Sequence, residues 1–245
     1  MGERARNIRQ AMELEGATAE EISETLEEIQ VEEEGRDPRE RGRRSGIPEK
    51  YLCVNWDDIE MDGRRKSIEA TRRWAESYEP RRAAWKKDTS AGLYLWSDGE
   101  GADEDETGFG TGKTWIAAAA AEHLLGQGLR VRWLTVSRLM TNLNLGFSNP
   151  MYEDACHRVR EPRRGEAIIL DDIDKQPPTE RNIQPIFALV NDCTNNEIPL
   201  LITANRHIDA LQEDWGARFG HAAASRIIEH CLDVEVKGRD RRLPA

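Results

Sequence analysis

Short apolar runs alternate with helical patterns between residues 92 and 237. Most of the runs have the length of a buried strand, and the stretches between them place apolar residues with the period of a helix. The runs are residues 93–96, 131–136, 167–170, 200–203 and 233–236, and the helical stretches are residues 114–125, 178–193 and 223–231. Apolar strands that alternate with helices predict an α/β domain with a parallel sheet covered on both faces.

The first 45 residues follow a different pattern. Residues 4–14 and the stretch that begins with the capping box Thr18-Ala19-Glu20-Glu21 predict two short helices. The arginine-rich residues 35–45 predict a charged linker. Two helices of this size bury little apolar surface alone, so they would dock on the main domain or bind a partner. We expect a partner-binding N-terminal extension at residues 1–45 and one domain at residues 46–245, with a helix at residues 64–78.

Composition narrows the class of protein. Charged residues make up 33% of the 245 residues, no run approaches the roughly 18 apolar residues of a membrane span, and the first residues lack a secretory pattern, so we expect a cytoplasmic protein. The net charge of −11 argues against non-specific coating of duplex DNA, although local arginine clusters leave nucleic-acid binding open. We expect the four cysteines to be small buried side chains without disulfides; they are Cys53, Cys156, Cys193 and Cys231.

The segment Gly108-Phe109-Gly110-Thr111-Gly112-Lys113-Thr114 follows an apolar strand and opens a helix. Glycines allow backbone N–H groups to converge on phosphate oxygens, and the helix directs its positive end at the anion. Lys113 is expected to reach the β- and γ-phosphates, and Thr114 to bind Mg²⁺. The expected nucleotide-binding residues are Thr107, Gly108, Phe109, Gly110, Thr111, Gly112, Lys113, Thr114 and Trp115. The segment predicts a site for ATP or GTP with Mg²⁺.

Two features depart from the usual phosphate loop. Thr107 stands where the motif has its first glycine, and residues 97–106 separate the strand from the loop. This insertion contains the run Asp103-Glu104-Asp105-Glu106, which would repel a triphosphate lying beside it. We therefore expect the insertion to loop outward, either as a surface loop or as a contact for a neighbouring subunit or partner. Both departures leave the rate of hydrolysis open.

Polar residues follow two of the predicted strands. Asp171 and Asp172 end the strand at residues 167–170, where Asp171 is expected to hold Mg²⁺ and Asp172 to orient or deprotonate the attacking water. Asn205 follows the next strand and could hydrogen-bond the γ-phosphate or that water. Arg226 is a candidate for an arginine supplied across a subunit boundary, and Arg218 competes for that role. We expect Lys113, Asp172, Asn205 and Arg226 to take part in catalysis.

Several segments together resemble a known family, the DnaC/DnaI/IstB group of AAA+ ATPases. In family order they are Gly46-Ile47-Pro48-Glu49-Lys50-Tyr51, the phosphate loop, Leu170-Asp171-Asp172-Ile173, Ile202-Thr203-Ala204-Asn205 and Ser225-Arg226-Ile227. The resemblance implies a five-stranded parallel sheet in the order 5-1-4-3-2. It implies Asp171 and Asp172 as the Walker B pair, Asn205 as sensor I and Arg226 as the arginine finger. The chain ends nine residues after Val236, so a C-terminal helical lid is not expected.

Three functional hypotheses follow from this resemblance and from the residues. In the first, the chain is an ATP-dependent helicase loader that binds a DnaB-type replicative helicase through its N-terminal helices, binds single-stranded DNA, and assembles into a homo-oligomer through its ATP sites. In the second, it is an IstB-type transposition helper that binds duplex DNA and a transposase. In the third, suggested by Thr107 and the acidic insertion, it is a nucleotide-gated interaction module with negligible turnover.

Overall fold

A computed structural model describes most of the chain from residue 37 onward. The described residues are 37–61, 63–79, 84–85, 91–97, 110–145, 149–163, 165–177, 179–216, 220–238 and 240. The two helices predicted within residues 1–36 and the acidic run at residues 103–106 lie outside them.

The domain is built on a five-stranded sheet in which every neighbouring pair is parallel. Its strands are β3 (Gly92–Trp96), β4 (Arg130–Thr135), β5 (Glu166–Asp171), β6 (Leu200–Ala204) and β7 (Cys231–Glu235). They lie in the order β4-β5-β6-β3-β7, which is the predicted order 5-1-4-3-2 read from the other edge. The alternation of strands and helices therefore predicted the parallel sheet correctly, and the resemblance to the DnaC/DnaI/IstB group predicted its strand order correctly.

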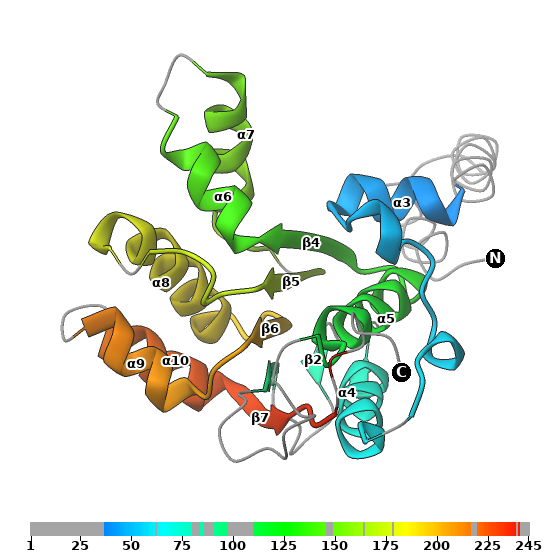
Figure 1. The fold of residues 1–245 in the computed structure, drawn as a ribbon. Helices are drawn as coiled ribbons and strands as arrows, with labels where there is room; N and C mark the ends of the chain where they lie inside the picture. Colours follow the sequence, from blue (N-terminus) through cyan, green and yellow to red (C-terminus); the bar gives the residue numbers. More distant parts are fainter. Residues whose placement is uncertain are drawn as a thin grey trace, which may run out of the picture.

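Helices cover both faces of the sheet, as Figure 1 shows. On one face lie α4 (Arg65–Ser77) and α5 (Lys113–Gly126), and on the other lie α8 (Glu180–Asn195), α9 (Ile208–Trp215) and α10 (His221–His230). Successive strand residues enter opposite cores, because side chains alternate across a strand. Leu93 and Leu95 pack with α4 and α5, whereas Tyr94 packs in the core that includes α8, α9 and α10.

Some elements were not predicted from the sequence. These are the helices α6 (Val136–Leu143), α7 (Pro150–Arg158) and α9, the 3-10 turns η1 (Glu49–Tyr51) and η2 (Trp56–Asp58), and the antiparallel pair β1 (Tyr78–Glu79) and β2 (Ala84–Trp85). Both α6 and α7 extend from the sheet beyond β4 (Figure 1). The prediction of a strand at residues 131–136 extended one residue too far, because apolar Val136 begins α6.

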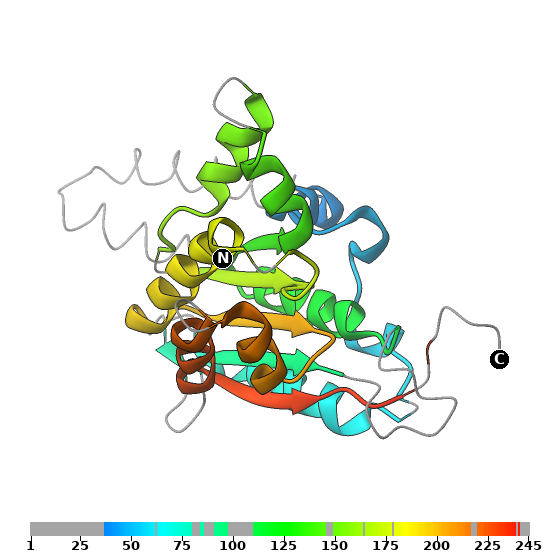
Figure 2. The same cartoon turned by 60° about the vertical axis from the view of Figure 1, so that its left-hand side comes forward.

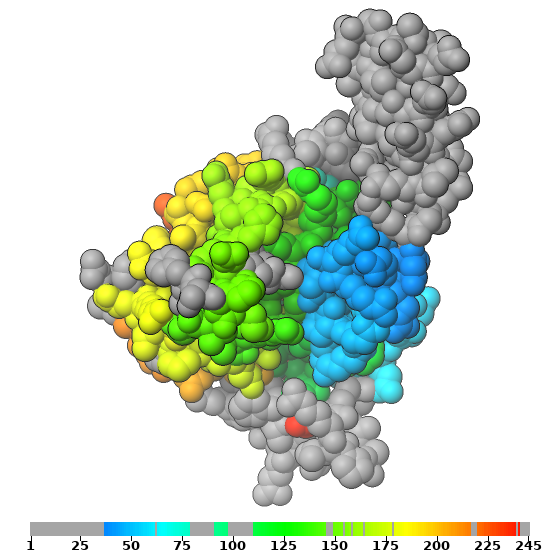
Figure 3. All heavy atoms as spheres, turned by 90° about the horizontal axis from the view of Figure 1, so that it is seen from above, coloured from blue at the N-terminus to red at the C-terminus, as the bar shows by residue number. Residues whose placement is uncertain are grey.

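The linker predicted at residues 35–45 is wrong where the structure describes it. Residues 38–45 form helix α3 (Pro38–Ser45), which the Asp37 side chain caps by accepting a hydrogen bond from the N–H of Arg39. Gly46 ends the helix in a left-handed conformation with φ 88°. The helix contacts α5 and β4, and Figure 3 shows its residues, in blue, lying against green residues of the domain. This part of the predicted extension therefore packs on the domain.

The expectation of four buried cysteines holds for two of them. Cys193 and Cys231 are buried, Cys156 is half-buried and Cys53 is exposed, and all four are free thiols. Cys53 lies in a turn at the surface, where its φ is 62°. None of the described helices combines the length and the apolarity that crossing a membrane requires.

Candidate nucleotide-binding site

The predicted site residues meet at one edge of the sheet. In a parallel sheet the carboxyl ends of all strands lie on the same side, and Figure 2 shows the strand arrows pointing to that side. The phosphate loop leads from the end of β3 into α5, Asp171 ends β5, and Asn205 follows β6. Because β5, β6 and β3 are neighbours, these segments lie next to one another.

The described part of the phosphate loop has the backbone that an anion site needs. Gly110 and Gly112 have φ of 66° and 92°, a left-handed conformation that favours glycine. Gly112 directly precedes α5 and, as a glycine, has no side chain that could cap the N–H groups of its first turn. The N–H groups of that turn are the donors that helix starts present to phosphate. Thr107, Gly108 and Phe109 lie outside the described residues, so their part in the loop stays a prediction.

Lys113 is held at the end of β3. Its side chain is buried, and its Nζ donates a hydrogen bond to the Oγ of Ser97 at 2.5 Å. Ser97 also lies 3.1 Å, Oγ to Oγ1, from the hydroxyl of Thr111 in the loop. The serine that follows β3 therefore connects the loop and its lysine, and it orients the ammonium group.

The loop and the acidic strand end are joined by a direct hydrogen bond. The Thr114 hydroxyl donates to Oδ1 of Asp171 at 3.1 Å, across 57 residues of sequence. The Thr203 hydroxyl on β6 donates to the same oxygen at 2.8 Å and accepts a hydrogen bond from the backbone N–H of Asp172 at 2.9 Å. Thr203 thus fixes both members of the acidic pair.

The two aspartates have different environments. Burial raises the pKa of Asp171 to about 6, and repulsion from Asp172 acts in the same direction, whereas hydrogen bonds from Thr203 and Thr114 and the charge of Lys113 oppose the shift. A cation beside Asp171 would favour its ionised form. Asp172 is less buried and has φ 58°, a conformation uncommon for a residue other than glycine. This turn directs the chain away from β5 at the predicted catalytic carboxylate.

Asn205 is paired with a third aspartate. The backbone N–H of Asn205 donates to Oδ2 of Asp174 at 3.0 Å, and its side-chain amide lies 3.2 and 3.3 Å from the two carboxylate oxygens. The next residue is also held, because the Tyr94 hydroxyl donates to the carbonyl of Arg206 at 2.7 Å. The predicted sensor residue therefore has a fixed position at the end of β6.

The predicted arginine finger is tied to its own helix. Arg226 on α10 donates to Glu229 at 2.7 Å, one turn further along that helix. The side chain keeps 39% of its surface exposed, as a residue reaching a neighbouring subunit would require. Arg218 lies outside the described residues. The choice between the two arginines stays a prediction.

Trp115, directly after the loop, has an exposed aromatic side chain. It keeps 39% of its surface exposed and contacts the ring of Tyr51 edge-on, with 5.3 Å between ring centres. The Nζ of Lys50 lies 4.5 Å from the centre of the same Tyr51 ring. The predicted Gly46–Tyr51 segment and the phosphate loop thus meet at an aromatic surface.

The residues present fit a nucleotide with Mg²⁺. The Thr114 hydroxyl and the Asp171 carboxylate lie together and are the oxygen ligands that Mg²⁺ prefers. The positive charge of Lys113 lies close enough to Asp171 to oppose the rise of the pKa of that carboxyl group.

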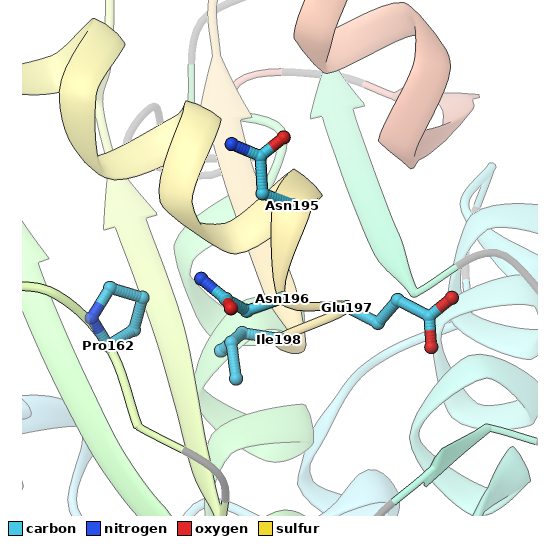
Figure 4. Close-up of a pocket in the computed structure, with 5 residues that line it drawn as sticks. All are labelled: Pro162, Asn195, Asn196, Glu197 and Ile198. Carbon is cyan, nitrogen blue, oxygen red and sulfur yellow. The ribbon is translucent and has the colours of Figure 1, made fainter.

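A hollow near the amino ends of the strands is separate from this site, which lies at their carboxyl ends. It has a volume of about 390 Å³ and is lined by Pro162, Asn195, Asn196, Glu197 and Ile198 (Figure 4). Pro162 precedes β5 and Ile198 precedes β6, so the hollow lies at the amino ends of the strands. It therefore contributes nothing to the site at their carboxyl ends.

Comparison with known proteins agrees with this geometry. A family model described as "IstB-like ATP binding protein" matches residues 107–245, more than half of the chain. The chain belongs to this IstB-like family. The matched region of this IstB-like protein includes the phosphate loop, the acidic pair, Asn205 and Arg226.

Two curated relatives match this IstB-like chain over part of their length. The replicative helicase loader DnaC of Buchnera aphidicola (subspecies Acyrthosiphon pisum) is 29% identical over 138 residues, covering 54% of this chain and 48% of the relative. A putative ATP-binding protein in an insertion sequence of Mycobacterium tuberculosis is 29% identical over 97 residues, covering 40% of this chain and 38% of the relative. The chain spans about half the length, or less, of these relatives.

Solved structures share the fold. The crystal structure of DnaI superposes with a TM-score of 0.60 at 22% identity, covering 80% of this chain and 94% of that one. The DnaC helicase loader superposes with a TM-score of 0.55 at 18% identity, covering 78% and 100% of the two chains. The IstB-like chain therefore has the AAA+ fold of the DnaC/DnaI/IstB group, as its motifs predicted.

Sequence reasoning missed three positioning residues of the IstB-like site. Thr203 stood inside a recognised motif, but only the pairing of β5 with β6 shows its two hydrogen bonds. Ser97 and Asp174 directly follow predicted features, yet no spacing rule marks them as partners of Lys113 and Asn205. A polar residue at the end of an apolar strand is the signal that could have identified Ser97.

Proposed function

We propose that this IstB-like chain is a Mg²⁺-dependent ATPase that loads a replicative ring helicase onto single-stranded DNA. The observation that carries the ATPase part is the hydrogen bond between Thr114 and Asp171, which joins the phosphate loop to the acidic strand end. The loader part is supported by the Buchnera relative that is named a replicative helicase loader.

Each site residue then has a chemical role. The loop residues from Thr107 to Trp115 bind the phosphates, with Lys113 reaching the β- and γ-phosphates. Thr114 and Asp171 hold Mg²⁺, which when bound neutralises phosphate charge. Asp172 orients or deprotonates the attacking water, and Asn205 fixes that water or the γ-phosphate.

Assembly completes the site in this proposal. Arg226 is partly exposed on α10 and would approach the γ-phosphate held by a neighbouring copy, where it would stabilise charge in the transition state. ATP would thereby join subunits of a homo-oligomer, and hydrolysis would release them. The N-terminal extension would bind the DnaB-type helicase, and the ATPase domain would bind single-stranded DNA.

Turnover measured with the full chain tests the ATPase. Asp172→Asn keeps the shape of the side chain but removes the base, so ATP turnover should fall by about 10²- to 10⁴-fold while nucleotide affinity changes little. Asp209→Asn, at an exposed position on α9, is the control and should keep full activity. If the wild-type chain binds ATP but shows no turnover that Asp172→Asn abolishes, the nucleotide-gated interaction module is favoured instead.

Helicase capture tests the loader. The full chain, held with a non-hydrolysable ATP analogue, should retain a DnaB-type helicase and should increase the amount of helicase bound to a single-stranded circle. Lys113→Ala is the control, because it should lose both effects with nucleotide binding. Absence of retention and of stimulated loading would rule out the loader.

A transposition helper is the second candidate, favoured by the Mycobacterium tuberculosis relative from an insertion sequence. Its core motifs would be the same, but its partners would be duplex DNA and a transposase. A gel-shift titration with matched single-stranded and duplex oligonucleotides separates the two. The loader predicts ATP-dependent preference for the single strand, and the helper predicts preference for the duplex.

A further inference from the structure

Arg64, far upstream of the phosphate loop, is buried against it. Only 3% of Arg64 is exposed, and its Nη1 donates a hydrogen bond to the carbonyl of Thr111 at 3.1 Å. Its Nη2 donates to the carbonyl of Glu60 at 2.5 Å. The guanidinium thus bridges two backbone carbonyls that lie on segments about 50 residues apart, one of them inside the loop.

The same guanidinium packs on Gly112. A Cβ at position 112 would lie 2.0 Å from Nη1 and 3.3 Å from Cζ of Arg64, so no side chain fits there while Arg64 keeps its place. Gly112 also needs φ 92°, which other residues rarely adopt. Both constraints concern the residue that caps α5 and precedes Lys113.

The backbone of Arg64 is itself fixed at the start of α4. Its carbonyl accepts hydrogen bonds from the Ser67 hydroxyl at 2.8 Å and from the N–H of Ile68 at 2.9 Å. Ile68 and Trp74 on α4 are buried in the same core as the alanines of α5. The guanidinium is therefore presented by an element that is packed against the helix following the loop.

The hydrogen bond from Arg64 to the Thr111 carbonyl also orients the next backbone N–H, that of Gly112. In a trans peptide the C=O and the N–H point in opposite directions, so fixing the carbonyl of Thr111 fixes the N–H of Gly112. That N–H points away from Arg64, and N–H groups of this loop are the ones that bind phosphate oxygens. The guanidinium stays charged at any pH that a protein tolerates, and it adds positive potential beside the loop.

We propose that Arg64 is a positioning residue of the phosphate loop, which aligns the Gly112 amide for a nucleotide phosphate through the Thr111 carbonyl. This inference rests on the nucleotide binding proposed above. Arginine suits the role because its planar fork presents several donors in fixed directions, whereas the lysine ammonium is a single point on a flexible stem.

Calorimetric titration of the full chain with MgATP and with MgADP tests the inference. Arg64→Gln should weaken both affinities by about 10- to 100-fold, as expected for the loss of a charge-assisted hydrogen bond. Arg64→Lys should give an intermediate loss. Arg65→Gln is the matched control, because Arg65 is 78% exposed on the same helix and pairs only weakly with Glu69, so its affinities should equal those of the wild type.

A second readout separates positioning from general stability. In protein labelled with ¹⁵N-glycine and free of nucleotide, Arg64→Gln should move the amide resonance of Gly112, and Arg65→Gln should not. Unchanged affinity and an unchanged Gly112 resonance in Arg64→Gln would overturn the inference and leave the proposed function standing. If Arg64→Gln does not fold, Arg64→Lys decides, and wild-type affinity in that variant overturns the inference. A wild-type chain that binds no nucleotide contradicts the proposed function itself.

Discussion

Asp174 accepts hydrogen bonds from both the backbone N–H and the side-chain amide of Asn205, at 3.0 Å and at 3.2–3.3 Å. A carboxylate can only accept, so Asn205 must turn its NH₂ group toward Asp174. Its Oδ1 then points away from Asp174 and is suited to accept a hydrogen bond from water. The second hydrogen of the amide can still donate to a phosphate oxygen, so this orientation suits both the water and the γ-phosphate role of Asn205.

Asp174→Ala should therefore reduce ATP turnover more than nucleotide affinity. Without the carboxylate the amide of Asn205 can rotate, and we expect kcat to fall by about 10-fold with KM changed less than threefold. Asp192→Ala, at a half-buried position on α8, is the control and should keep wild-type kinetics. Equal kinetics for both variants would show that Asp174 does not position Asn205. Steady-state turnover over a range of ATP concentrations measures this.

Thr203→Val removes the hydroxyl that holds Asp171 and the N–H of Asp172 but keeps the shape of the side chain. Turnover should fall by about 10-fold or more, and the free energy of unfolding by about 1–2 kcal/mol, because one buried and one partly buried hydrogen bond are lost. Thr203→Ser should restore most of the turnover. The control Thr194→Val loses one helix-surface hydrogen bond on α8 and should leave turnover unchanged. A Thr203→Val protein with full turnover would contradict this role.

Subunit mixing tests Arg226. Lys113→Ala and Arg226→Gln should each be inactive, but a mixture should regain about a quarter of wild-type turnover, because some interfaces then combine an intact loop with an intact arginine. Glu229→Gln is the matched control: it breaks the ion pair of Arg226 and should stay active. Equal losses in Arg226→Gln and Glu229→Gln, with no recovery on mixing, would mean that the ion pair is the whole function of Arg226.

The ionised carboxylate of Glu166, at the start of β5, should make the free energy of unfolding fall in acid. Burial alone raises the pKa of Glu166, but hydrogen bonds from Arg160, the Arg163 backbone and Arg132 lower it to about 2, below the ordinary 4.5. The unfolded chain then binds the proton more tightly, so the stabilisation is complete above pH 4.5 and is lost as the pH falls toward 2. Urea unfolding between pH 7 and pH 3 measures this loss.

Removing the negative charge of Glu166 by mutation should also lower the free energy of unfolding, and it should do so at neutral pH. Glu166→Gln leaves Arg132 and Arg160 without their buried carboxylate and should lower the unfolding free energy by about 3 kcal/mol. The control Glu69→Gln removes an exposed pair with Arg65 and should change it by less than about 1 kcal/mol. If Glu166→Gln keeps the wild-type dependence on pH below 4.5, the carboxylate of Glu166 is not its source.

The sequence was sufficient for four strands of the sheet because they are mostly buried apolar runs, of which β5 is buried along its whole length. The edge strand β7 is mostly exposed, and it begins two residues before the predicted strand at residues 233–236. The sequence was insufficient where a residue suits two kinds of secondary structure or where charge hides a helix. Val136 suits a strand as well as the start of α6, and the charges of residues 38–45 concealed a helix that Asp37 and Gly46 delimit. Asp174 and Arg64 were beyond sequence reasoning, because they act through contacts with residues 31 and 47 positions away along the chain. Ser97 had only a weak signal, its place directly after an apolar strand.

The most direct test is calorimetric titration of the full wild-type chain and of Lys113→Ala with MgATP. The hydrogen-bonded arrangement of Lys113, Thr114 and Asp171 predicts saturable binding near one nucleotide per chain, and a loss of at least about 100-fold in affinity for Lys113→Ala. No binding by the wild-type chain, or equal binding by the two proteins, would contradict a nucleotide site at this edge of the sheet.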